Sequence, residues 1–315
     1  MPTTLKDIAE ACAIDMSTVS RAIRGDSRVK LQTRERICAK AKEMGYFANV
    51  AARTLAGAKT QTIWLLVRNF NNGFDQNIAE LTSRSLSKVG YDISLMSYHN
   101  SPERYQYLLS RLSQGVCDGA IVIPTTYMGY EDELLKLNKK GFPLVFLDRE
   151  PSFSKHTIVT TDNKKGVQGL IELLQKEGAT KFVVLYGQHN SAEEKRLKGA
   201  IQYLDEKKVP YVTQENLKEG YITGNDKIGI LSTASGTIVK NMEPYKKVMK
   251  SKNTVIGLFD DGLNSNFPAS KVYVCIQDFE KLSKKAAELI VDLIAGKKQS
   301  RSNHTVLAKE YYKAR

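Results

Sequence analysis

The sequence predicts a small all-α module at the N-terminus, followed by a larger α/β region with two parallel sheets. Two short amphipathic helices fit within residues 4–25, TLKDIAEACAIDMSTVSRAIRG. From Thr62 onward, short apolar runs alternate with helical stretches, a pattern typical of parallel sheets covered by helices on both faces. The number of strand-helix units exceeds what one sheet holds comfortably, so we expect two α/β lobes.

The first helix begins with a capping box, in which Thr4 and Asp7 each satisfy a backbone donor of the first turn. A break at residues 13–15 follows, and Asp15 is expected to cap a second helix. The apolar side chains of the first helix share one face: Leu5, Ile8, Ala9 and Cys12.

The second helix is expected to bury Val19, Ala22 and Ile23. Its other side chains form a polar and basic surface: Met16, Ser17, Ser20, Arg21 and Arg24. Two short helices, a tight turn and such a surface match a helix-turn-helix whose second helix enters the DNA major groove. From these residues alone, an ordinary pair of amphipathic helices remains the alternative. A third helix is predicted over residues 31–44, with Gly45 as a left-handed cap.

Residues 49–60, NVAARTLAGAKT, are rich in alanine and too short to form a stable isolated helix in water. Beyond them, the periodicity predicts buried strands separated by helices. The strands are expected at residues 63–67, 93–97, 120–124, 144–147, 182–186, 255–259 and 272–276, and helices at 77–89, 102–114 and 164–176.

Composition favours a DNA-binding protein of the cytoplasm over an enzyme or a membrane protein. The net charge is +13, and residues 1–60 contain 11 Lys/Arg against 6 Asp/Glu, a net +5. No apolar segment approaches the length of a transmembrane helix, and the N-terminus lacks a signal-peptide core. Phosphate-loop, dinucleotide, zinc-protease and serine-hydrolase motifs are missing, and the four histidines and four cysteines show no metal-ligand spacing. We therefore expect no catalytic activity, no cofactor and no metal.

A family resemblance makes the helix-turn-helix interpretation specific. Asp7-Ile8-Ala9, residues 17–21 (STVSR), Gly45-Tyr46 and residues 51–55 (AARTL) together resemble the N-terminal signature of the LacI/GalR family of bacterial transcription regulators. The resemblance implies a helix-turn-helix domain over residues 1–47, a hinge helix over 48–60 and an effector-binding and dimerisation domain over 61–315. The last would be a two-lobed core of the periplasmic-binding-protein type, with lobe one at 61–161 and 279–300 and lobe two at 162–278 and 301–315.

The implied function is sequence-specific regulation of transcription, most simply repression of carbohydrate-utilisation genes under control of a sugar-like effector. A homodimer would bind a near-palindromic operator, and Leu55 of each hinge helix would wedge into the minor groove. A plain linker is the alternative for the hinge, and a sugar-binding protein without regulatory activity is the alternative for the whole chain. The residues expected at the DNA are Thr4, Met16, Ser17, Thr18, Ser20, Arg21, Asn49, Ala52 and Leu55.

Ligands of open α/β sheets bind at the carboxyl ends of the strands, which directs attention to the residues just past each strand. Together with the resemblance, this rule predicts effector contacts through carboxylates, arginines and an aromatic face, a set suited to a sugar. For Arg149 and Tyr221 above all, a surface salt bridge or strand-end cap remains the alternative. The sequence departs from the family at Ala13 in the helix-turn-helix turn, where glycine is usual. It also departs in the second lobe, at Ala234-Ser235, so the effector pocket is expected to be altered. The predicted effector residues are Asn72, Phe74, Thr125, Asp148, Arg149, Arg196, Tyr221 and Asp260.

Overall fold

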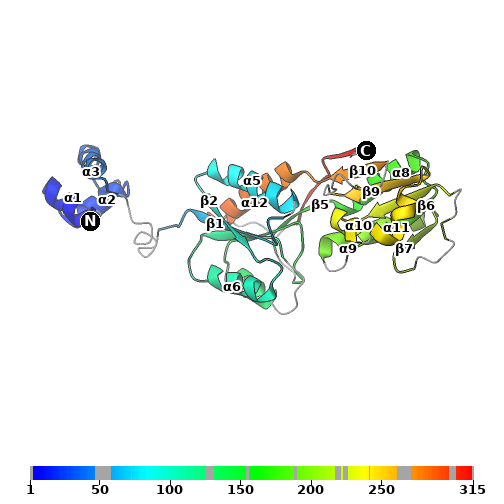
Figure 1. Ribbon diagram of the computed structural model, residues 1–315. Coiled ribbons are helices and arrows are strands. Elements are labelled where there is room, and N and C mark those ends of the chain that lie inside the picture. Colours follow the sequence, from blue (N-terminus) through cyan, green and yellow to red (C-terminus); the bar gives the residue numbers. More distant parts are fainter. Residues whose placement is uncertain are drawn as a thin grey trace. The chain divides into compact units, whose positions relative to one another are not determined.

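The computed structural model describes residues 3–46, 58–71, 73–124, 131–153, 156–187, 190–216, 221–222, 226–240, 242–260, 271–297 and 303–313. The chain divides into two compact units, Met1–Thr60 and Gln61–Arg315. The second unit contains two sheets of six strands each, which we call lobe one and lobe two. The predicted fold class, a helical N-terminal domain followed by a two-lobed α/β domain, is therefore confirmed (Figure 1).

The N-terminal unit consists of three helices around a small core. They are α1 (Leu5–Cys12), α2 (Met16–Ile23) and α3 (Leu31–Glu43). Ile8 of α1, Val19 of α2 and Ile37 of α3 are fully buried against one another. Gly45 has a φ of +64°, as expected for the residue that ends α3.

All but two of the strands and helices of lobe one lie in the first half of the α/β domain. Its sheet order is β11-β5-β4-β3-β1-β2, and every pairing in it is parallel. The elements are β1 (Thr62–Val67), α5 (Gly73–Ser87), β2 (Asp92–Ser97), α6 (Pro102–Leu112), β3 (Gly119–Val122), α7 (Glu131–Lys139), β4 (Leu144–Leu147), β5 (Ile158–Thr161), α12 (Phe279–Ile294) and β11 (Asn303–Val306).

The strand β1 shows why its sequence TIWLLV is apolar on both faces. Ile63, Leu65 and Val67 pack with α5 and α12, whereas Trp64 and Leu66 pack with α6 on the opposite face. Figure 1 shows α5 beside α12 on one side of this sheet and α6 on the other. Since successive side chains of a strand point to opposite faces, a sheet covered twice needs an unbroken apolar run.

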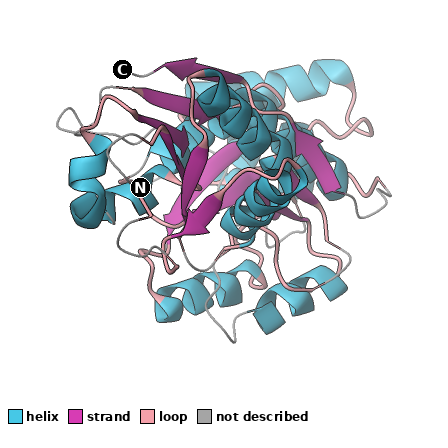
Figure 2. Ribbon diagram, turned by 90° about the vertical axis from the view of Figure 1, so that its right-hand side faces the viewer, coloured by secondary structure: helices cyan, strands magenta, loops and turns pink. Residues whose placement is uncertain are grey.

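Lobe two repeats this arrangement with the sheet order β12-β10-β9-β8-β6-β7, and β12 is its antiparallel strand. The helices surround the strands in the turned view of Figure 2. The elements are α8 (Asn163–Lys176), β6 (Lys181–Leu185), α9 (Ser191–Glu206), β7 (Tyr211–Thr213), β8 (Ile228–Ser232), α10 (Ser235–Lys240), α11 (Met242–Met249), β9 (Thr254–Phe259), β10 (Val272–Ile276) and β12 (Glu310–Lys313).

The end of the chain corrects one predicted boundary. Residues 301–315 were expected in lobe two as a block, but β11 pairs in parallel with β5 of lobe one, with Asn303 opposite Ile158. Only β12 joins lobe two, where Tyr311 lies opposite Cys275. The chain therefore crosses between the lobes a third time between Val306 and Glu310, because each of these two short strands completes the edge of a different sheet.

Candidate DNA-binding surface and interlobe cleft

Local hydrogen bonds hold both the start of α1 and the turn between α1 and α2. The Thr4 N–H donates to Asp7 Oδ2 (2.7 Å) and the Asp7 N–H donates to Thr4 Oγ1 (3.3 Å), which confirms the predicted capping box. Ala13, with φ 54° and ψ 46°, adopts the left-handed conformation, and its N–H bonds to the carbonyls of Ala9 and Glu10. A left-handed alanine costs about 1 kcal/mol, so the substitution for the usual glycine keeps the turn at a modest cost.

Asp15 is the N-terminal cap of α2, as predicted. Its Oδ1 accepts the N–H groups of Ser17 (2.8 Å) and Thr18 (3.1 Å), and the Thr18 hydroxyl donates to Oδ2 (2.6 Å). These bonds satisfy two backbone donors of the first turn that have no partner inside the helix. The direction of α2 is thus tied to the turn that precedes it.

The outward face of α2 presents the side chains predicted to contact DNA. Met16 is 56% exposed, and Ser17 and Arg21 are also exposed, while Ser20 is half-buried. An exposed methionine at the start of a helix is unusual for a folded surface but suits apolar contact with a thymine methyl group. Of the residues predicted at the DNA, Asn49, Ala52 and Leu55 lie outside the described residues.

In the second unit, two carboxylates follow directly after parallel strands and face each other across the lobes. Asp148 comes after β4 of lobe one, and Asp260 comes after β9 of lobe two. Both have left-handed backbones, with φ of 65° and 66°. Such strain in a residue other than glycine costs about 1–3 kcal/mol and is concentrated at functional sites.

Arg196 of α9 lies at the centre of these groups and is only 3% exposed. Its Nε donates to Asn163 Oδ1 (2.7 Å) and its Nη1 donates to the Thr233 carbonyl (2.9 Å). The guanidinium carbon stacks 3.7 Å from the centre of the Phe259 ring. The planar guanidinium is thus hydrogen-bonded along two edges and stacked on one face. The compact ammonium group of a lysine could not make these contacts together.

The charges around Arg196 are arranged as a buried network. Its Nη1 lies 3.6 Å from Asp260 Oδ2, and its Nη2 lies 3.9 Å from Asp148 Oδ1. Burial raises the pKa of Asp260 to about 6, although the positive charge of Arg196 and hydrogen bonds from Gln277 act in the opposite direction. The Nε of Arg149 lies 3.6 Å from Asp148 Oδ2, which adds a second cation to the network.

Further contacts join the two lobes beside this network. The Glu150 N–H donates to Ser191 Oγ (2.6 Å), and the Glu150 carboxylate forms an ion pair with Lys195. Thr161 ends β5 of lobe one, where the chain first crosses to lobe two, and Gln277 follows β10, where the chain returns to lobe one. The Thr161 hydroxyl donates to Gln277 Oε1 (2.5 Å). The lobes therefore meet through polar side chains, and we call this polar interface around Arg196, between the carboxyl ends of the strands of the two lobes, the cleft.

The structure brings Asp148, Arg149, Arg196 and Asp260 together, but not every predicted effector residue. Phe74 is half-buried in lobe one and packs edge-on against Phe279, with ring centres 5.6 Å apart. Asn72 and Thr125 lie outside the described residues.

Tyr221 is also predicted to contact the effector, but the structure does not bring it together with the residues around Arg196. Its hydroxyl donates to the Phe182 carbonyl (3.4 Å), and Lys181 Nζ lies 5.5 Å from its ring centre. Both partners lie at the amino end of β6, whereas the cleft lies at the carboxyl ends of the strands. The alternative given above for Tyr221, a structural contact at the end of a strand, therefore fits its position.

Sequence reasoning missed several polar residues of the cleft. Glu193 accepts hydrogen bonds from the Gly187 N–H (2.9 Å) and the hydroxyls of Thr233 (3.3 Å) and Thr237 (3.4 Å). Gln277 donates to both oxygens of Asp260 at 3.0 Å. Gln277 and Thr233 each follow the end of a strand, so the strand-end rule, applied to every strand of lobe two, would have found them.

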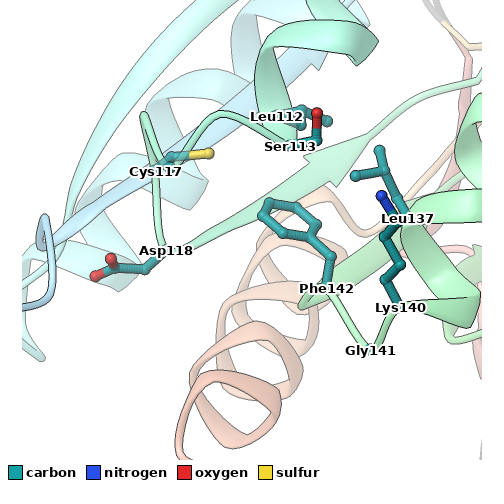
Figure 3. A pocket seen from close by; sticks show the side chains of 9 residues that line it. Leu112, Ser113, Cys117, Asp118, Leu137, Lys140, Gly141 and Phe142 are labelled. Atoms are coloured by element: carbon teal, nitrogen blue, oxygen red, sulfur yellow. The ribbon is translucent and has the colours of Figure 1, made fainter. Parts of the chain in front are cut away.

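A separate cavity of about 360 Å³ lies in lobe one (Figure 3). Its lining includes Leu112, Cys117, Leu137 and Phe142. Cys117 and Phe142 precede β3 and β4, so this cavity lies at the amino ends of the strands, opposite the cleft. Burial raises the pKa of the Cys117 thiol to about 12, which leaves it unreactive at neutral pH.

The described part of the chain contains no group of three or more His, Cys, Asp or Glu side chains that could hold a metal ion. Among the helices described, none is long and apolar enough to cross a membrane.

Comparison with known proteins relates the N-terminal unit to a single family. Residues 4–49 match the family described as bacterial regulatory proteins, lacI family. The chain is 27% identical over 213 residues to the HTH-type transcriptional regulator DegA of Bacillus subtilis, a match that covers 67% of this chain and 63% of DegA. It is also 27% identical over 209 residues to the catabolite control protein A of Staphylococcus aureus, covering 65% of this chain and 62% of that protein. The matches thus span less than two thirds of these relatives.

Solved structures show the same fold over the whole chain. The lac repressor dimer bound to operator and the anti-inducer ONPF aligns with a TM-score of 0.77 and 18% identity, covering 99% of this chain and 98% of that chain. The transcriptional regulator CelR in complex with cellobiose aligns with a TM-score of 0.65 and 19% identity, covering 98% of both chains.

Proposed function

Because the chain belongs to the LacI family of bacterial regulatory proteins through its N-terminal domain, we propose that it is a sequence-specific DNA-binding regulator of transcription. In this proposal it acts as a repressor of carbohydrate-utilisation genes, and a sugar-like effector changes its affinity for the operator. Bacterial chromosomal DNA lies in the cytoplasm, so the proposal also places the protein there. The proposal assigns it no catalytic activity.

The observation that carries the proposal is the exposed outer face of α2. A capped, eight-residue helix that buries Val19 and Ala22 while leaving Met16, Ser17 and Arg21 exposed has the form of a recognition helix. Relatives of this chain are a transcriptional regulator and a catabolite control protein, and the lac repressor is seen bound to its operator. The alternative, a sugar-binding protein without regulatory activity, does not account for this helix.

On the DNA, two protomers would place one α2 each in successive major grooves of a near-palindromic operator. Met16 and Ser17 are expected to select bases, while Arg21 would contact guanine or a phosphate. Asn49, Ala52 and Leu55 stay predicted contacts of a hinge helix in the minor groove.

The effector is proposed to bind in the interlobe cleft around Arg196. Asp148 is 7% exposed, and its Oδ1 has no hydrogen-bond partner within the described residues, so it is a ready acceptor for a ligand hydroxyl. A sugar that replaces the Glu150 contacts to Ser191 and Lys195 would change the relative stability of open and closed lobes. Through linkage, the same ligand would change the affinity of the N-terminal domains for DNA. CelR, which shares this fold, is seen with cellobiose.

A mobility-shift experiment tests the regulatory proposal. The full chain and a chain that begins at residue 61 are compared on the same genomic fragments. We expect the full chain to shift specific fragments, with affinity that falls steeply as salt rises, because lysines and arginines displace condensed counterions. Equal behaviour of the two proteins would refute the proposal.

The effector proposal needs a separate test. Sugars and sugar derivatives are screened for those that raise the melting temperature of the full chain, since a ligand that binds the native state stabilises it by mass action. Asp148→Asn is then expected to weaken the response to the best sugar at least tenfold while operator binding is retained. An unchanged response would place the effector elsewhere.

A further inference from the structure

The first turn of α2 carries a negative charge that DNA contacts must accommodate. Asp15 is exposed, and its carboxylate is fixed by the Ser17 and Thr18 N–H groups on Oδ1 and by the Thr18 hydroxyl on Oδ2. A carboxylate has about four acceptor sites, so three are used and one, on Oδ2, remains open. The side chain is thus held in one orientation with one acceptor free.

This carboxylate stays ionised and lacks a compensating cation. Hydrogen bonds from Ser17 and Thr18 hold the pKa of Asp15 far below its usual value. Two other acids of the domain, in contrast, have close basic partners: Asp26 lies 2.6 Å from Arg28, and Glu43 lies 2.7 Å from Lys40. In the described part of the domain, no lysine or arginine lies within ion-pair distance of Asp15.

We propose that Asp15 is a specificity-determining residue, whose fixed carboxylate selects a base with a major-groove amino group at one position of each half-site. The inference rests on the proposed function, in which the start of α2 faces base edges. A phosphate cannot approach this end of the helix, because the backbone donors that would bind it are occupied by a carboxylate of the same charge.

The chemistry of the bases then limits what can face Asp15. In the major groove only cytosine N4 and adenine N6 donate hydrogen bonds, whereas guanine and thymine present acceptors. A carboxylate that cannot be protonated at neutral pH can only accept. Cytosine and adenine are therefore favoured at this position, and guanine and thymine are rejected by repulsion between acceptors.

Thr18 acquires a different role from the one predicted for it. Its hydroxyl proton is committed to Asp15 Oδ2, so the side chain acts as a positioning residue that orients the carboxylate. Its own contact with DNA is not needed for this role, and its half-buried position agrees with it.

The test is the selection of bound sequences from a randomised duplex library by the full chain and by the variants Asp15→Asn and Thr18→Val. Asparagine is as good an N-terminal cap as aspartate, so the variant is expected to fold. The matched control is Asp26→Asn, which removes the same charge from the same domain beyond the other end of α2. Melting temperatures of all proteins are recorded alongside.

The wild-type protein and Asp26→Asn should enrich cytosine or adenine over guanine and thymine at one position of each half-site by about tenfold, the size of one good base contact. Asp15→Asn should lower this preference at least fivefold at that position only, and Thr18→Val should lower it less. Unchanged preference in Asp15→Asn would show that Asp15 is only a cap and overturn the proposal. Absence of any enrichment by the wild-type protein would instead refute the regulatory function itself.

Discussion

Replacing Asp260 by asparagine should change how the stability of the protein depends on pH. The pKa of Asp260 is raised from 3.8 to about 6, so its ionised form is about 3 kcal/mol less favourable in the folded than in the unfolded protein, at 1.36 kcal/mol per tenfold change in proton affinity. Below pH 3.8 the carboxyl is protonated in both states and carries no penalty. As pH rises from 3.8 through 6, the unfolded state releases the proton first, and stability is lost.

Asp260→Asn removes this ionisation. An amide accepts from Gln277 through only one oxygen, which we expect to cost about 1 kcal/mol. At pH 4 the carboxyl of the unfolded wild type is already more than half ionised, so the variant should be only about 0.5 kcal/mol less stable than the wild type. At pH 7.5 the variant should be about 2 kcal/mol more stable. The measurement is urea unfolding followed by circular dichroism across this pH range, fitted separately at each pH.

The control for loss of one carboxylate is Asp292→Asn. Asp292 is partly exposed and pairs with Lys297 at 2.8 Å, and such surface pairs contribute about 0.2–1 kcal/mol. Parallel stability curves for the wild type and Asp260→Asn between pH 4 and 7.5 would refute the reasoning, because they would show that burial of Asp260 near Arg196 does not shift its ionisation.

Four further substitutions test other parts of the structure. Ala13→Gly should stabilise the N-terminal domain by about 0.5–1 kcal/mol by relieving a left-handed alanine, and a lower melting temperature of this domain would contradict it. Gly166→Ala should destabilise lobe two by about 1–3 kcal/mol, because the new Cβ would lie 2.5 Å from the Phe259 ring; a neutral result in urea unfolding would show that the ring can move. Glu150→Ala and Lys195→Ala should each open the cleft, which would be measured as faster hydrogen exchange of the residues that border it. In the double variant, the coupling energy between the two substitutions should be about 0.5–1 kcal/mol. Additive effects of the two substitutions would show that the ion pair does not hold the lobes together.

The sequence predicted most of the fold because its signals are local. The capping box at Thr4, the cap at Asp15 and the glycine after α3 act within a few residues, and each is found where it was expected. Apolar runs such as residues 63–67 and 255–259 mark strands buried on both faces. These patterns need no knowledge of distant contacts.

The rest depends on contacts between distant residues. The half-exposed strand β11 has an ordinary polar sequence, and only its pairing with β5 assigns it to lobe one. Tyr221 could not be placed from sequence, because its position follows from Lys181 and Phe182, about forty residues earlier. Glu193 likewise becomes a cleft residue only through its bonds to Thr233 and Thr237.

Competition binding measures whether α2 reads a specific DNA sequence. The full chain is titrated with the duplex that it enriches most from a random library and with random duplex of equal length, at one physiological salt concentration. We expect the full chain to prefer the enriched duplex by about a thousandfold or more. Equal affinity for the two duplexes would contradict it.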